Sequence, residues 1–109
     1  MNNEIVERII GRAEKIVTYG EKASTYDNFS CDPMLVDACA YNLIQIEGLI
    51  NKLDESFIKQ YQDIKWHEMD NMLTRIVNEN GVDAYLIWQI ISNDLPDLLV
   101  RLHQILKSE

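Results

Sequence analysis

The sequence predicts an all-α protein, folded as an antiparallel bundle of four to five helices. Glycine and proline are scarce, with 4 and 2 among 109 residues, which is too few for a β-rich protein with frequent turns. Apolar residues recur at helical spacing along most of the chain, and no segment stands out as a strand. The length is that of one domain, so we expect residues 1–109 to form a single helical-bundle domain.

The first two helices have the clearest signals. An apolar stripe predicts the first helix and comprises Ile5, Val6, Ile9, Ile10, Ala13, Ile16 and Val17. Residues 24–33 are predicted to form a loop. Asp32 followed by Pro33 is typical of a helix start, because Asp caps free N–H groups and Pro suits the first helical position. The second helix then runs to about Leu53, and Cys39 on its buried stripe is interpreted as a small core residue.

Three further helices follow. A short one is predicted over residues 54–61, and a fourth runs over 66–77 until residues 78–81 end it, because Asn and Gly tolerate the left-handed conformation of a helix stop. Asp83 is a candidate cap for the fifth helix. Pro96 interrupts the apolar pattern of that helix, and we expect it to kink or restart the helix because Pro donates no N–H.

The charge balance is acidic. Ten Lys and Arg residues face 18 Asp and Glu residues, a formal net charge of -8. Non-specific nucleic-acid binding draws its affinity from cations on phosphates, so a general RNA- or DNA-coating role is disfavoured, although a local basic cleft stays open. Arg8, Arg12 and Lys15 form a short basic line on the first helix, interpreted as a solvated face because acidic residues flank it.

The sequence also predicts a cytoplasmic location. Two cysteines are too few for a small secreted domain held by disulfides. The first residues lack the basic and apolar layout of a signal peptide, and no apolar run approaches the length of a membrane span.

The residues alone reveal no catalytic constellation. His67-Glu68 begins the zinc motif His-Glu-x-x-His, but Asn71 stands where the second His is required. We expect His67 to be a surface residue at a helix start and His103 to lie near the carbonyl end of the last helix. No metal site and no cofactor are predicted.

Several segments read in order carry a family pattern. They are Asp37-Ala38, Asn42-Leu43, Trp66, Met72, Val82-Asp83, Trp88 and Asp94-Leu95-Pro96. In this order the chain resembles the HepT-like branch of the HEPN superfamily. The resemblance implies a four-to-five-helix homodimer and a place in a toxin–antitoxin system with a minimal nucleotidyltransferase partner. Active members are metal-independent ribonucleases, whose Arg-x4-His-x-Tyr motifs from two subunits meet in a cleft at the dimer interface.

The chain departs from this motif at its functional positions. The register without gaps places Leu73 at the Arg position, Asn78 at the His position and Asn80 at the Tyr position. A leucine cannot stabilise charge on a phosphorane, and an asparagine cannot act as general acid or base. Arg75 is the nearby guanidinium. We therefore expect no catalytic residue, but a residual cleft lined by Leu73, Arg75, Asn78 and Asn80.

Three functional hypotheses follow. The first is a catalytically degenerate HepT-like protein that forms a homodimer and binds a protein partner, a minimal nucleotidyltransferase, with RNA disfavoured as a ligand. The second is a ribonuclease with a rearranged site that uses Arg75 and His67. The third is the substrate-binding subunit of a separate nucleotidyltransferase.

Overall fold

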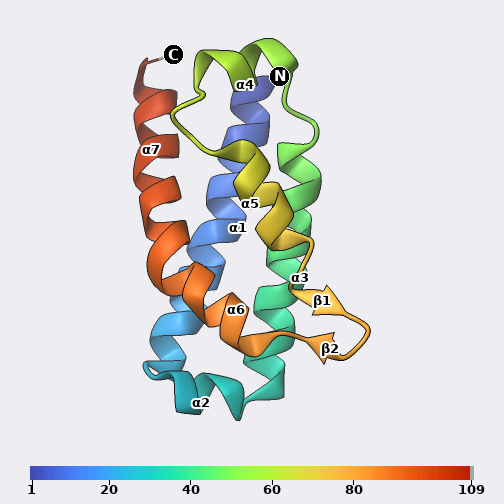
Figure 1. Cartoon of the computed structure of the whole chain (residues 1–109). Helices are drawn as coiled ribbons and strands as arrows, with labels where there is room; N and C mark the ends of the chain where they lie inside the picture. The colour runs from blue at the N-terminus through green and yellow to red at the C-terminus, as the bar shows by residue number, and fades with distance from the viewer. Residues whose placement is uncertain (109) are drawn as a thin grey trace.

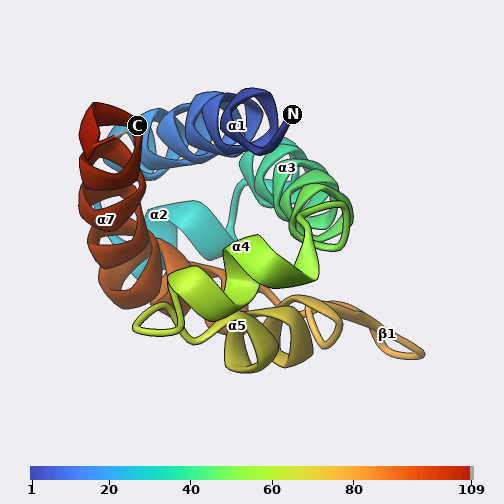
Figure 2. The same cartoon turned by 90° about the horizontal axis from the view of Figure 1, so that it is seen from above.

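Three long helical segments enclose the core. In the computed structural model, which describes residues 1–108, α1 (Asn2–Ala23) packs between α3 (Pro33–Ile50) and α7 (Leu95–Ser108) (Figure 1). Seen from above, the shorter α4 (Glu55–Gln60) and α5 (Trp66–Leu73) cover the side opposite α1 (Figure 2). The predicted all-α bundle is confirmed.

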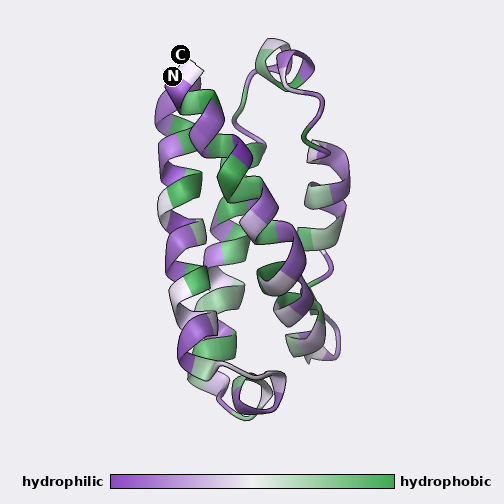
Figure 3. Ribbon diagram, turned by 90° about the vertical axis from the view of Figure 1, so that its left-hand side faces the viewer, coloured by the Kyte–Doolittle hydropathy of each residue, from purple (hydrophilic) through white to green (hydrophobic). Residues whose placement is uncertain are grey.

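The core consists of the apolar stripes that these helices turn toward one another (Figure 3). α1 contributes Val6, Ile9, Ile10, Ala13 and Ile16, each buried. On α3 the buried stripe includes Cys39, as predicted, and Asp32 accepts a hydrogen bond from the Leu35 backbone N–H at 3.2 Å to cap the helix start. Capping and burial therefore act together to fix where α3 begins and which face it buries.

The predicted loop over residues 24–33 is wrong in part, because it contains the short helix α2 (Tyr26–Ser30). The Thr25 hydroxyl accepts from the Asn28 N–H at 3.1 Å, which caps the helix. Phe29 is fully buried and packs against Trp88 with ring centroids 5.1 Å apart. Burial of one aromatic side chain thus stabilises a helix too short to show a periodic pattern.

The prediction of a helix over 66–77 is also wrong at its C-terminal end. α5 stops at Leu73, and the chain then forms a hairpin of β1 (Val77–Asn78) and β2 (Gly81–Val82). Gly81 has a φ of 108°, which a residue without a Cβ adopts at little cost. The same Asn and Gly residues that predicted a helix stop therefore make a hairpin turn, and the expectation that the chain holds no strand is corrected. The second helix also ends slightly early, at Ile50 rather than near Leu53.

The last helical rod contains a π-helical turn just before the proline. Asp83 accepts from the Leu86 N–H at 3.0 Å and caps α6 (Ala84–Gln89), as predicted. A π-helical turn over Ile90–Asp94 then leads into α7. Helix direction changes between α6 and α7 (Figure 1). A π turn shifts the backbone hydrogen-bond register, which accommodates the missing N–H of Pro96 without breaking the rod.

Two glycines of α1 provide a matched test of the packing beside this π turn. A Cβ at Gly20 would lie 2.9 Å from Cγ2 of the buried Ile91, whereas a Cβ at Gly11 would meet nothing within 4 Å. We expect Gly20→Ala to lower the free energy of unfolding by about 1–3 kcal/mol, because a β-branched core side chain must move. Gly11→Ala should raise it by about 0.5–1 kcal/mol through helix propensity. Urea unfolding measures both, and equal effects would contradict the close contact.

Candidate functional site

A large groove lies between α5 and α7. Its volume is about 1060 Å³, and the π turn and the segment before α5 complete its walls. Charged residues of both signs line it, namely Asp63, Lys65, Glu68, Arg75, Asp94, Asp97 and Arg101. We call it the Arg75 groove.

One of its two arginines is already engaged. Arg101 donates from Nε and Nη2 to the two carboxylate oxygens of Asp63, at 2.6 and 3.3 Å. These hydrogen bonds lower the pKa of Asp63, and the guanidinium also stacks over the Tyr61 ring with its carbon 5.4 Å from the ring centroid. Arg75, in contrast, is exposed in the turn after α5 and forms no ion pair within 4.0 Å among residues 1–108. It is therefore the guanidinium of this groove that is available to an anion.

The acidic wall contains one perturbed carboxyl group. Partial burial raises the pKa of Asp94, and the negative charge of Asp97 raises it further. A similar pair is formed by Glu47 of α3 and Asp70 of α5. Burial raises the pKa of Glu47, and Asp70 raises it further through its charge and a hydrogen bond. Both carboxyl groups consequently hold a proton at a higher pH than an ordinary Asp or Glu.

Neither histidine lines the Arg75 groove. His67 is exposed at the start of α5, as predicted. His103 was expected near the terminal carbonyls of the last helix, but its Nε2 lies 3.7 Å from a carboxylate oxygen of Glu14 on α1. Among residues 1–108, no three His, Cys, Asp or Glu side chains gather in a group that would hold a metal ion. Nor does this part of the chain contain a helix with the length and apolar character of a membrane span.

Similarity to known proteins identifies the family of this chain. The ribonuclease HepT-like family matches residues 6–105. The chain belongs to this family. The protein is 27% identical to "Putative RNase TTE0752" of Caldanaerobacter subterraneus subsp. tengcongensis, over 81% of this chain and 80% of the relative. Identity is 26% to "Putative RNase MJ0127" of Methanocaldococcus jannaschii, over 76% and 69% of the two chains, and 23% to "Probable ribonuclease HepT" of Thermococcus cleftensis, over 82% of each. No solved structure gives a significant match.

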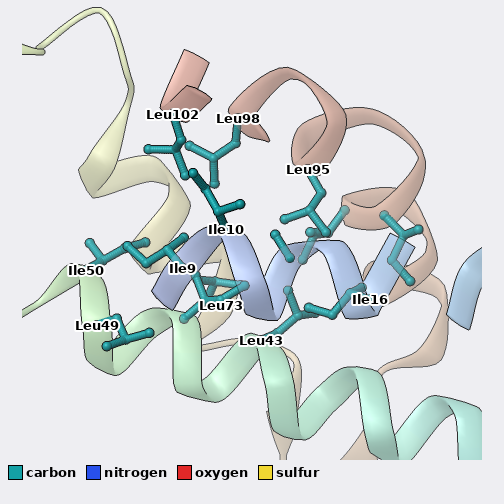
Figure 4. Packing of buried hydrophobic residues seen from close by; sticks show 14 of the residues in the cluster. Ile9, Ile10, Ile16, Leu43, Leu49, Ile50, Leu73, Leu95, Leu98 and Leu102 are labelled. Atoms are coloured by element: carbon teal, nitrogen blue, oxygen red, sulfur yellow. The ribbon is translucent and has the colours of Figure 1, made fainter. Parts of the chain in front are cut away.

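The four residues expected to line a residual cleft lie in three different environments. Leu73 is 1% exposed and joins the core near Ile9 and Leu43 (Figure 4). Arg75 lines the groove. Asn78 and Asn80 are exposed on the hairpin outside the groove lining, where the Asn80 N–H donates to the Asn78 side-chain oxygen at 2.9 Å. Within one subunit, the structure therefore does not bring these four side chains into a single cleft.

Sequence reasoning missed Asp63 and Arg101. These residues stand 38 positions apart, in the segment before α5 and in α7, and neither belongs to a motif. Only the fold joins them, by placing Arg101 of α7 over the Tyr61 ring and beside Asp63. A weak signal was the helical spacing of Asp94, Asp97 and Arg101, which places them on one side of the last rod.

The burial of Leu73 predicts the cost of placing an arginine at this position. Leu73→Arg would place a guanidinium in the core without a carboxylate partner, and we expect the free energy of unfolding to fall by about 3 kcal/mol or more. The matched control is Thr74→Arg at the exposed next position, where a cation near a helix C-terminus should change stability by less than about 0.5 kcal/mol. Urea unfolding measures the free energy of unfolding of both variants. A Leu73→Arg protein as stable as the native chain would contradict the prediction, because the arginine would then have to reach solvent.

Proposed function

We propose that this chain is a catalytically degenerate HepT-like protein that forms a homodimer, binds a minimal nucleotidyltransferase and does not cleave RNA. The observation that carries the proposal is the character of the motif positions. An apolar core residue, Leu73, stands at the arginine position, and an amide, Asn78, stands at the histidine position. Membership of a family whose relatives are named as ribonucleases supplies the fold and the ancestral chemistry.

The argument against cleavage is chemical. Metal-independent cleavage of RNA requires one group to take the proton of the attacking 2′-hydroxyl and another to protonate the leaving oxygen. A cation must also stabilise the phosphorane. Arg75 supplies such a cation, but neither His67 nor His103 lines its groove. Without an imidazole, the groove is suited to hold an anion rather than to transfer protons.

A ribonuclease with a rearranged site is the second candidate. It is favoured by Arg75, whose guanidinium has no ion-pair partner among the described residues, and by Asp94 in the same groove. Because the pKa of Asp94 is raised, this carboxyl group is a better proton acceptor than an ordinary aspartate. His67, the imidazole that this hypothesis first used, does not line the groove.

A nuclease assay separates the two candidates. We expect the purified protein to leave structured and single-stranded RNA intact over hours, because it lacks a positioned acid–base pair. A HepT-like ribonuclease with an intact motif is the positive control for sensitivity. Cleavage that is lost in Arg75→Ala and in Asp94→Asn, with both variants folded, would replace the proposal with the rearranged site.

We assign the interface of the proposed homodimer to the hairpin and to the exposed apolar face of α3. Val77 and Val82 are paired across the strands and are 46% and 39% exposed, and Ile44 on α3 is 40% exposed. Val77 and Val82 lie opposite one another on the hairpin, and β2 contacts α3, the helix that carries Ile44; we call these three exposed apolar side chains the hairpin patch. Exposed apolar residues gathered in this way mark an interface. A second copy is the fitting occupant, because the resemblance places the two motifs at the subunit boundary and the hairpin carries Asn78 and Asn80.

Charge reversal on the hairpin patch tests this dimer. Light scattering after gel filtration should give twice the chain mass of 12.7 kDa for the native protein. We expect Val77→Glu/Val82→Glu to give the monomer mass, because two carboxylates would be desolvated in the interface. Val100→Glu is the matched control, since Val100 is 61% exposed on α7, and it should remain a dimer. A native monomer, or dimers in all three proteins, would contradict the assignment of this surface.

The nucleotidyltransferase partner is proposed from the family resemblance and is tested by co-expression. The protein and a minimal nucleotidyltransferase encoded beside it should co-purify at fixed stoichiometry. A nucleotidyltransferase that elutes separately at micromolar concentration would remove this part of the proposal and leave the dimer standing.

A further inference from the structure

A second groove, of about 340 Å³, lies between α1 and α3, which run side by side (Figure 2). Its α1 wall carries Arg8, Arg12 and Lys15, and its other wall carries Gln45 and, just beyond the end of α3, Lys52. The basic line seen in the sequence therefore faces a further cation and an amide donor across a groove. We call this surface the α1–α3 groove.

The charge of this groove is not compensated locally. Four of the ten Lys and Arg residues line it, and none of the Asp and Glu side chains of residues 1–108 does. None of the four cations lies within 4.0 Å of a described carboxylate, whereas Lys59, for example, pairs with Glu55. Like charges gathered at short range repel one another, so the groove favours an anionic ligand.

The acidic residues that flank the basic line in the sequence lie outside the groove lining. Glu7 precedes Arg8 and Glu14 precedes Lys15 by one position, which turns each of them about 100° around the helix from that cation. Glu14 points to α7, where His103 lies 3.7 Å away. Glu4 stands one turn before Arg8 on the same side of α1, but it does not line the groove and forms no ion pair with Arg8 within 4.0 Å. The flanking acids that suggested an ordinary solvated face therefore do not neutralise the groove.

One groove cation is held in place by the core. Arg12 donates from Nη1 to the side-chain oxygen of Asn42 at 3.1 Å, and Asn42 donates to the Ala38 carbonyl at 2.8 Å. Asn42 is only 5% exposed and is the buried polar residue among the described side chains. The Arg12 guanidinium also lies 5.5 Å from the centroid of the exposed Tyr41 ring. A guanidinium has five N–H donors, so most remain free for a ligand, and its fixed position lowers the entropy cost of binding.

We propose that the α1–α3 groove binds phosphate groups, supplied by an RNA backbone or by a nucleotide. The planar guanidinium of an arginine can donate two parallel hydrogen bonds to the oxygens of a phosphate. Closely spaced phosphates carry several negative charges, which match the four cations of the groove. The groove has the volume of a small-ligand site and is open to a longer chain. The exposed Tyr41 ring beside it provides a face on which a base can stack. This site is separate from the Arg75 groove and does not depend on whether the protein cleaves RNA.

Fluorescence anisotropy with a short fluorescein-labelled oligouridylate tests the proposal at about 50 mM salt. Arg8→Gln/Lys15→Gln/Lys52→Gln removes three exposed cations and keeps the Arg12–Asn42 contact. We expect its Kd to rise about tenfold or more and the slope of log K against log salt to fall by about 2, since single-stranded phosphate contacts contribute roughly 0.7 each. Lys22→Gln/Lys59→Gln/Lys107→Gln is the matched control with the same net charge, and its Kd should change less than about twofold.

Competition distinguishes the sources of phosphate. Displacement of the labelled RNA by ATP or pyrophosphate would identify a nucleotide-type site, and displacement by unlabelled RNA alone would identify a backbone site. Polyglutamate of equal charge should compete poorly. The proposal fails if the native protein does not bind, if both triple variants weaken equally, or if polyglutamate competes as well as RNA. Circular dichroism and melting temperature establish that both variants are folded.

Discussion

Burial of the apolar stripe of α1 between α3 and α7 is the interaction on which the rest of this molecule depends. It fixes two helices on either side of α1, and so positions both grooves. The α1–α3 groove is the outer edge of the first contact. The Arg75 groove forms where α7, held by the second contact, approaches α5. Because such cores are closely packed, a change in one helix contact would move a groove wall as well as reduce stability.

The burial of Leu73 and Ile76 has a comparable local effect on the motif region. These two side chains are 1% and 0% exposed, and they hold the end of α5 and the following turn against the core. The Ile76 carbonyl also accepts from the Asp83 N–H at 2.8 Å, which closes the hairpin segment at its base. Asn78 and Asn80 are therefore presented on a short projection, whereas Arg75 remains at the groove. In this way, the position that the resemblance aligns with the motif arginine is used here for packing.

Charge is distributed unevenly over this acidic protein. In the Arg75 groove most cations face carboxylates, as the bidentate Arg101–Asp63 contact shows, and only Arg75 is left exposed without an ion pair among residues 1–108. In the α1–α3 groove, no carboxylate of the described residues lines the walls. The net charge of -8 is thus a poor guide to local potential. It excludes a protein that coats nucleic acid, but it leaves room for a confined anion site.

The features that depend on residues close together in the sequence could be predicted from the sequence alone. Helical periodicity gave the bundle, and the caps at Asp32 and Asp83 were found because capping depends on neighbours within one turn. The family pattern was likewise readable from the order of short segments. Other features depended on residues that are distant in sequence. The short helix α2 is stabilised by the packing of Phe29 against Trp88. Residues 78–81 form a hairpin turn because Val77 and Val82 pair as strands next to the buried Ile76.

The two grooves show the same division. Asp63 meets Arg101 from 38 positions away, and Lys52 joins the basic line of α1 only when α3 packs beside it. A linear pattern records which charges a helix carries, because the 3.6-residue repeat is a property of one segment. Which charges it meets is set by the crossing of helices, and that follows from the fit of side chains across the core.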